Sequence, residues 1–294
     1  MLLVLPALMH ESIPWVRAVA AAALLTVLAS ACGAEPAERP AESAEEAVDE
    51  WTRPVFEHES VQKAVEREYE RLRRVEGRTG ILAEERRYST FDEELIIRDF
   101  FQDRRGGFFL DVGCAWPIRA NNTYYLEKHL GWKGIGVDAL AEYAPAWKQE
   151  RPSSRFFSNL VTDRSGDQET FFRSPSTGLS STDRTWAAGK LFGDSLEPEE
   201  VKVESITLDD LLEREEVGKI DLLSMDIEGH EPKALAGFDI DRFRPELVVI
   251  ERPFPPKQVG RDQVHGYFEE HGYELIEKYR PFDAVNWYFR PKGS

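Results

Sequence analysis

The chain has 294 residues, of which 41% are hydrophobic, and its formal net charge is −17. This length allows one sizeable domain with additional segments, and the apolar fraction is sufficient for a packed core. The negative charge argues against non-specific nucleic-acid binding, because a phosphate backbone would be repelled.

Residues 1–32 have the features of an export signal. Arg17 precedes an unbroken run of small and apolar residues, 18–31, and Cys32 follows it. The run is shorter than the about 20 residues of a transmembrane helix but has the length of a signal-peptide core. The residues around Cys32 resemble a bacterial lipobox, whose cysteine is lipidated. We therefore expect a lipoprotein-like anchor in the bacterial cell envelope, on either membrane face; an ordinary signal-peptidase site, an uncleaved anchor and a later start at Met9 stay open.

Two further segments precede the main domain. Residues 33–56 are rich in Glu, Ala and Pro, which predicts a disordered acidic linker. Residues 57–87 carry an apolar stripe at steps of four, four and three, which predicts a helical extension. The remaining residues, 88–294, are expected to form the main domain.

The first strand of that domain is predicted to follow the turn at 104–107, after a helix at 91–102, with Asp111 at its carboxyl end. The run from Phe108 leads into Asp111 and then Gly113, which is typical of a strand followed by a tight loop near a ligand. Gly113 lacks a Cβ, so the backbone can adopt a positive φ there. Cys114, in the same loop, is interpreted as a small apolar residue and not a nucleophile, because no basic neighbour in the local sequence would lower its pKa.

A second strand, 135–138, also ends in an acid, Asp138. Helices are predicted on either side of it, at 121–130 and 141–149, and a third strand follows at 155–161. In a nucleoside site, an acid at this position accepts hydrogen bonds from both ribose hydroxyls. Two strands that each end in an aspartate make a nucleotide-type α/β sheet more convincing than either strand alone.

The segment from Ser174 to Asp194 is rich in Ser, Thr and Gly and has little periodicity. It is interpreted either as a mobile loop that covers a site or as an ordinary surface loop.

The most informative segment is Ile220–Glu231, a buried strand that runs into an acidic turn. A helix at 232–236 and a strand at 244–251 follow it. After a helix at 264–271, two closing strands are predicted at 273–276 and 285–289. The expected fold is therefore α/β and Rossmann-like: a seven-stranded, mostly parallel sheet with helices on both faces and an antiparallel last strand.

Taken together, the segments 108–117, Asn122-Thr123, 131–135 and 220–231 resemble the FkbM-type methyltransferase family, which has the class I methyltransferase fold. The resemblance runs from about residue 88 to the end of the chain. Its most specific part is the Asp-x-Glu-Gly-x-Glu pattern that begins at Asp226.

The resemblance implies S-adenosylmethionine (SAM) as the cofactor and a hydroxyl of a sugar, glycan or other small molecule as the methyl acceptor. By position, Asp111, Gly113 and Ala115 would surround the methionine end of SAM, Asp138 would hold the ribose, and Asn159 would lie near the adenine. Ala115 replaces a preferred glycine, and so does the proline two residues later, which removes one N–H from the loop.

A hydroxyl acceptor must lose its proton, and the candidate bases are Asp226, Glu228 and His230. Asp226 is preferred and Glu228 is second; the two would point to one face if the strand continued through them. The structural alternative is that Glu228 and Glu231 have no catalytic role and only stabilise the N-terminus of the following helix through its dipole. No metal is expected, because no second histidine cluster supports one.

A second hypothesis is a catalytically inactive methyltransferase-fold binding protein tethered at the envelope. The altered glycine loop and the export signal favour it, since SAM is made and kept in the cytoplasm. A nicotinamide dehydrogenase is disfavoured because the chain lacks the G-x-G-x-x-G pattern.

Overall fold

A computed structural model describes residues 88–175, 178–190, 195–252, 258–283 and 285–293. The predicted signal segment 1–32, linker 33–56 and helical extension 57–87 lie outside the described residues. No helix within the described ranges is long and apolar enough to cross a membrane.

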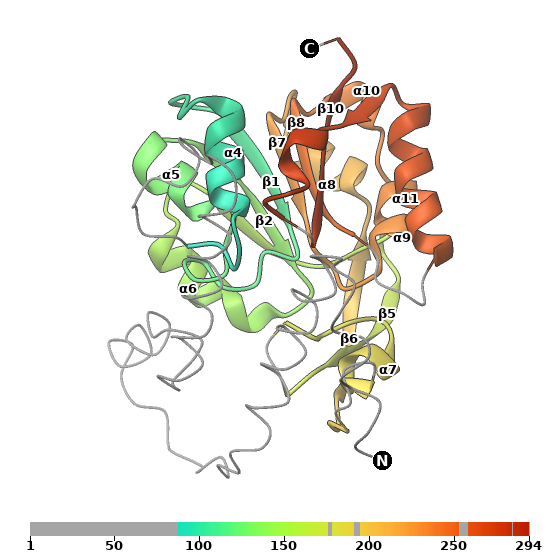
Figure 1. The fold of residues 1–294 in the computed structure, drawn as a ribbon. Coiled ribbons are helices and arrows are strands. Elements are labelled where there is room, and N and C mark those ends of the chain that lie inside the picture. Colours follow the sequence, from blue (N-terminus) through green and yellow to red (C-terminus); the bar gives the residue numbers. More distant parts are fainter. Residues whose placement is uncertain (1–87, 176–177, 191–194, 253–257, 284, 294) are drawn as a thin grey trace, which may run out of the picture.

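A seven-stranded sheet is the centre of the described part of the chain (Figure 1). From one edge to the other, its strands are β3 (Arg155–Ser158), β2 (Lys133–Asp138), β1 (Phe108–Val112), β7 (Leu222–Met225), β8 (Leu247–Glu251), β10 (Asn286–Pro291) and β9 (Tyr273–Leu275). The β3, β2, β1, β7 and β8 strands pair in parallel, whereas β10 is antiparallel to both of its neighbours. The predicted fold class is confirmed, including the antiparallel last strand.

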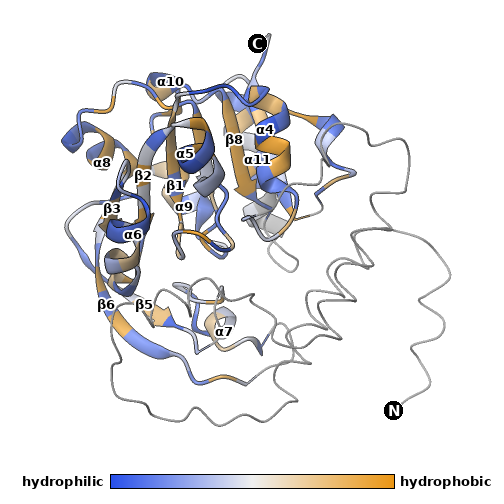
Figure 2. Ribbon diagram, turned by 90° about the vertical axis from the view of Figure 1, so that its left-hand side faces the viewer, coloured by the Kyte–Doolittle hydropathy of each residue, from blue (hydrophilic) through white to orange (hydrophobic). Residues whose placement is uncertain are grey.

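Helices cover both faces of this sheet. One face packs against α4 (Glu93–Phe101) and α5 (Tyr124–Leu130), and the other packs against α8 (Leu208–Arg214), α9 (Glu231–Ala236), α10 (Ile240–Phe243) and α11 (Gln258–Glu270). The central strands are correspondingly mostly hydrophobic (Figure 2). Strands buried on both faces are expected in a parallel sheet.

The alternation of side chains in β1 shows how the sequence divides the core. Phe109 belongs to the cluster on the α4 face, whereas Leu110 and Val112 belong to the cluster on the α11 face. In β7, Leu222 and Leu223 divide in the same way. This period of two follows from the pleat of a strand.

A smaller sheet was not foreseen from the sequence. Within the described residues it consists of β4 (Leu160–Val161), β6 (Glu199–Ile206) and β5 (Gln168–Arg173). The predicted third strand is therefore split, because β3 belongs to the main sheet and β4 to the smaller one. The β6 strand escaped notice because its alternating apolar residues, Val201 and Val203, stand among glutamates.

In the described part of 174–194, which was expected to be a loop, the structure has a short helix, α7 (Arg184–Ala187), that the sequence analysis did not predict. Asp183 caps this helix, because its side chain accepts the backbone N–H groups of Thr185 and Trp186. The smaller sheet and α7 lie on the side of the main sheet where the parallel strands end (Figure 1). Side chains of this segment and of the β7–α9 turn meet there.

Candidate active site

Acidic side chains stand at the carboxyl ends of neighbouring strands in the main sheet. Asp111 lies near the end of β1, Asp138 ends β2, Asp226 follows β7 and Glu251 ends β8. The register pairs Met225 with Ile250, so Asp226 and Glu251 come next to each other. This edge is where open α/β sheets bind their ligands.

Asp111 is buried, with 5% of its surface exposed, and its carboxylate has defined partners. Its Oδ2 accepts hydrogen bonds from Thr123 Oγ1 (2.7 Å) and Asn121 Nδ2 (3.2 Å). Burial raises the pKa of Asp111, while the Thr123 bond and the nearby Arg151 charge oppose that rise. The side chain is thereby fixed beneath the glycine loop.

Arg151 is a fully buried cation that organises this loop, and sequence analysis missed it. Its guanidinium donates to Glu127 Oε2 (2.6 Å), the Pro117 carbonyl (3.0 Å), Asn121 Oδ1 (3.0 Å) and Thr123 Oγ1 (3.0 Å). The group also lies over the ring of Trp147, 4.4 Å from its centroid. Aromatic stacking and multiple hydrogen bonds are the setting in which a buried arginine is best stabilised.

Gly113 lets the loop approach the β7–α9 turn closely. Its φ is +79°, and an added Cβ would lie only 1.8 Å from the backbone oxygen of Asp226. Its N–H donates to the Val137 carbonyl (2.8 Å). Ala115, also at a positive φ of 39°, donates its N–H to Asp138 Oδ2 (3.0 Å). Both amides therefore fix the loop to β2.

Asp138 is half-buried and held from two sides. Oδ1 accepts the N–H of Leu140 (2.8 Å), and Oδ2 accepts the N–H of Ala115. Burial raises its pKa to about 6, and these two hydrogen bonds oppose the shift. Each carboxylate oxygen has two lone pairs, so both can still accept a hydroxyl proton. These acceptor oxygens fit a ribose with two hydroxyls.

Asn159 and Cys114 have structural contacts at this edge. The Asn159 side-chain amide donates to the carbonyl of Glu204 in β6 (3.2 Å), and its backbone N–H donates to the Asp138 carbonyl (3.0 Å). Asn159 therefore joins the two sheets beside Asp138. Cys114 is buried, and burial raises the pKa of its thiol well above its ordinary value, in keeping with a packing residue.

Asp226 is exposed, whereas its neighbour Glu251 is only 6% exposed. The two carboxyl groups lie within hydrogen-bonding reach of each other. Desolvation by the surrounding protein atoms raises the pKa of Asp226 to about 6, and the interaction with the Glu251 side chain opposes this shift. Burial and the Asp226 charge raise the pKa of Glu251 well above its usual range, which leaves the shared proton on Glu251.

The side chains of Asp226 and Glu228 do not alternate along one strand, because β7 ends at Met225. Glu228 has a φ of 56°, a left-handed conformation in which glycine is favoured. Its Oε2 accepts a hydrogen bond from Trp186 Nε1 in α7 (2.5 Å), and its carbonyl accepts one from Ser181 Oγ (3.2 Å). The turn thus aims Glu228 toward the 178–190 segment.

Glu231 and His230 fix the same turn from inside. Glu231 is fully buried and its Oε1 accepts the N–H groups of Ile227 (3.1 Å) and Gly229 (3.2 Å). Burial raises its pKa to about 7. The His230 ring contacts Thr182 Oγ1 through Nδ1 (3.0 Å) and Thr162 Oγ1 through Nε2 (3.2 Å). His230 therefore links α9 to two segments and has no ring nitrogen aimed at Asp226.

The structure thus places the predicted residues in two groups. One group surrounds the glycine loop and consists of Asp111, Gly113, Ala115, Asp138 and Asn159; the other surrounds the acidic turn and consists of Asp226, Glu228 and His230. The close approach of Gly113 to Asp226 joins the two groups. Within the described ranges, no set of three or more His, Cys, Asp or Glu side chains has an arrangement that could hold a metal ion.

Glu251 and Trp186 were also missed from the sequence. The signal for Glu251 was present, because an acid closes β8 just as acids close β1 and β2. Trp186 gave no comparable signal, since its partner Glu228 lies 42 residues away.

Numbered along the chain within the main sheet, the strands lie in the order 3-2-1-4-5-7-6, with the seventh antiparallel. That order, together with acids at the ends of the first two strands, defines a class I methyltransferase fold. A model of the Methyltransferase FkbM domain matches residues 111–275, more than half of the chain. The chain therefore belongs to the FkbM methyltransferase family, which confirms the resemblance and with it SAM as the cofactor of the family.

Solved structures show similarity at low identity. A TehB-like SAM-dependent methyltransferase from Corynebacterium glutamicum is 17% identical, with a TM-score of 0.39, and the match covers 79% of this chain and 100% of that one. An O-methyltransferase from Bacillus cereus, in complex with S-adenosylhomocysteine (SAH), is 13% identical, with a TM-score of 0.36 and coverage of 83% and 96%. The comparison with curated proteins gives no match.

Proposed function

We propose that this protein is a SAM-dependent methyltransferase that methylates a hydroxyl group of a sugar, glycan or other small molecule. The observation that carries the proposal is the joining of two groups of acids at one sheet edge through Gly113, whose α-carbon packs on the Asp226 backbone. SAM, when bound, supplies an activated methyl group with a good leaving group. The protein has to orient the acceptor and take its proton.

The donor is proposed to lie over β1 and β2. Asp138 would accept its ribose hydroxyls, and Asp111, Gly113 and Ala115 would surround its methionine end, with Asn159 toward the adenine. Negative side chains at this edge complement a sulfonium cation. The backbone amides of Gly113 and Ala115 already have partners, so carboxylates would provide much of the recognition.

Asp226 is the proposed base. It is exposed and adjoins the glycine loop, so an acceptor hydroxyl can reach it. A pKa of about 6 leaves most of it ionised at neutral pH and still basic enough to accept a proton. Glu228 is the second candidate, and its bond to Trp186 suits it better to shaping the acceptor side.

Transfer of a labelled methyl group tests the proposal. The full-length protein is incubated with methyl-labelled SAM and a panel of neutral sugars and glycans, and the product is treated with alkali. An ether on a hydroxyl survives alkali, whereas an ester is hydrolysed. We expect alkali-stable label with the native protein and none with Asp226→Asn. Transfer by Asp226→Asn at the native rate would move the base to Glu228.

A lipid anchor at Cys32 is a separate proposal, based on the sequence alone. Metabolic labelling with a radioactive fatty acid should mark the native protein and not Cys32→Ala. Equal labelling of both would exclude the anchor. If the anchor holds and labelled SAM gives no transfer, the inactive envelope-tethered binding protein becomes the better description.

A further inference from the structure

The ends of β7 and β8 bring two carboxyl groups together. The strands pair in parallel with Met225 opposite Ile250, so the next residues, Asp226 and Glu251, are neighbours across the sheet edge. Their carboxyl groups lie within hydrogen-bonding reach of each other, and a hydrogen bond between two carboxyl groups requires that one of them carry a proton. Two carboxylates in contact otherwise repel each other.

The two carboxyl groups differ in their access to water. Glu251 is 6% exposed and lies inside the sheet edge, where β10 pairs with its backbone through Asn286. Asp226 is exposed beyond the end of β7. Deep burial disfavours the charged form, so the proton resides on Glu251 and the negative charge on Asp226. Asp226 is therefore ionised on the side that a ligand can reach.

We propose that Glu251 is a positioning residue that shares one proton with Asp226, so that the pair, and not Asp226 alone, receives the proton of the acceptor hydroxyl. This inference rests on the proposed function. In the reaction, the acceptor oxygen forms a bond to the methyl carbon, and the electron pair of the broken S–C bond stays on sulfur. The hydroxyl proton passes to Asp226, which takes the pair from one proton to two and from a charge of −1 to 0. Water then removes the proton through the exposed Asp226.

Several other ionisable groups influence the pair, and the charged groups with the largest effects on it are acidic. They are Asp111 from β1, Glu228 and Glu231 from the β7–α9 turn and α9, and Asp283 before β10. This surrounding negative charge favours retention of the shared proton. A cation placed beside the pair favours its loss. The SAM sulfonium is such a cation, whereas the thioether of SAH is neutral.

The pair therefore makes a measurable prediction at the level of binding, before any acceptor is known. Because the sulfonium favours the doubly ionised pair, SAM affinity should rise with pH relative to SAH affinity, by linkage. The sulfonium makes the amino group of SAM titrate at lower pH than that of SAH, but this difference between the free ligands is the same for every variant, so it cancels when the ratios of the native protein and a variant are compared. We expect the SAM-to-SAH affinity ratio of the native protein to increase by about 5-fold or more between pH 6 and pH 9.

Titration calorimetry of the full-length protein with SAM and with SAH tests this. The ratio should lose this increase in Glu251→Gln, which retains a hydrogen-bonding side chain, and in Asp226→Asn, whose exposed site tolerates replacement. Glu93→Gln is the matched control, because Glu93 is another buried carboxyl with a raised pKa, and it should keep the native increase. Circular dichroism confirms that each variant is folded.

The outcomes separate this inference from the proposed function. Absence of SAM binding to the folded native protein would overturn the proposed function and this inference together. Binding with a native ratio that does not change with pH would overturn only the inference. An unchanged increase in Glu251→Gln would also overturn it, because the pH dependence would then come from other groups.

Discussion

Asp111 and Arg151 are joined through one hydroxyl group: Thr123 Oγ1 donates to Asp111 Oδ2 over 2.7 Å and accepts from Arg151 Nη2 over 3.0 Å. Asp111 holds the position expected to face the donor, while Arg151 lies 40 residues further along the chain and is fully buried. The acid at the ligand edge is thus fixed by a cation beneath it. We therefore expect changes in this network to affect both the stability of the fold and the binding of SAM.

Replacement of Arg151 by methionine should destabilise the fold by about 3–5 kcal/mol, because it leaves buried carboxylates without their cation. Urea unfolding at pH 7 measures the free energy of unfolding. Arg155→Met is the matched control: Arg155 pairs with Glu215, but its side chain is 49% exposed, so it should lose no more than about 1 kcal/mol. Equal losses in the two variants would show that the Arg151 network does not stabilise the loop.

Trp186→Phe should loosen the segment that packs on the acidic turn. Phenylalanine would keep an aromatic ring at this position, but Glu228 Oε2 would lose the Nε1–H donor that lies 2.5 Å away. A hydrogen bond to a charged group contributes about 1.5–3 kcal/mol. Hydrogen exchange should therefore accelerate at the amides of Ala187 and Ala188, which bond within α7. Unchanged exchange there would mean that Glu228 does not anchor the segment.

Glu93 should make the fold less stable as pH rises. Burial raises its pKa from 4.5 to about 8, with the Asp283 charge adding to the shift. The folded state then holds a proton that the unfolded state releases above about pH 4.5, so the stabilisation is complete below that pH and is lost between pH 4.5 and 8. Thermal unfolding of Glu93→Gln should show a smaller loss over this window than the native protein. Parallel curves would assign the pH dependence to other carboxyls.

The order of the elements was predictable because each central strand is a continuous apolar run that ends in a polar residue. Asp111, Asp138 and Asp226 were identified in this way, and the sheet places them at one edge. Glu251 ends its strand by the same rule, but its proximity to Asp226 depends on the pairing of β7 with β8, which the sequence does not show. The local sequence pattern is therefore sufficient to predict which acidic residues lie at the carboxyl edge of a parallel sheet.

Contacts between distant segments were not predictable. Arg151 stands in a polar stretch and looks like a surface residue, yet its partners Glu127, Asn121 and Thr123 bury it completely. Charged side chains are buried only with partners, and a sequence without coordinates does not reveal partners 24 to 30 residues away. The conformation of the turn at Glu228 was not predictable for a related reason, because its left-handed backbone depends on tertiary contacts.

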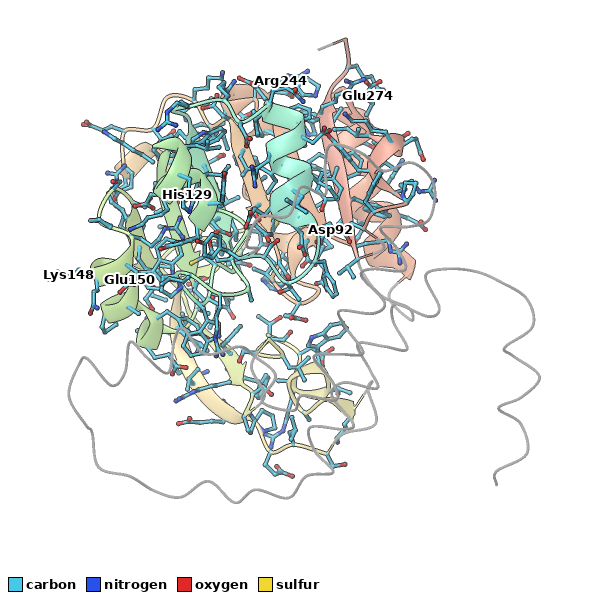
Figure 3. The ribbon with its side chains drawn as sticks, turned by 60° about the vertical axis from the view of Figure 1, so that its left-hand side comes forward. Asp92, His129, Lys148, Glu150, Arg244 and Glu274 are labelled. Carbon is cyan, nitrogen blue, oxygen red and sulfur yellow. The ribbon has the colours of Figure 1, made fainter. Side chains whose placement is uncertain are left out.

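Some acidic residues of this chain are buried and others are exposed, and the sequence alone does not show which. Glu274 on β9 and Asp92, which precedes α4, lie in different parts of the domain (Figure 3). Asp92 is 4% exposed, while the Glu274 side chain is 39% exposed and pairs with Arg290. Part of the acidity of this chain therefore lies inside the domain.

The most direct test of the central claim is calorimetric titration of the full-length protein with SAM and SAH at pH 7. We predict binding in the micromolar range and a loss of about 10-fold or more in Asp138→Ala, since a hydrogen bond to a charged group is removed. Glu142→Gln, an exposed acid next to the site, should bind like the native protein. If the folded native protein binds neither ligand, the carboxyl edge is not a SAM site, and the chain is better described as an inactive methyltransferase fold.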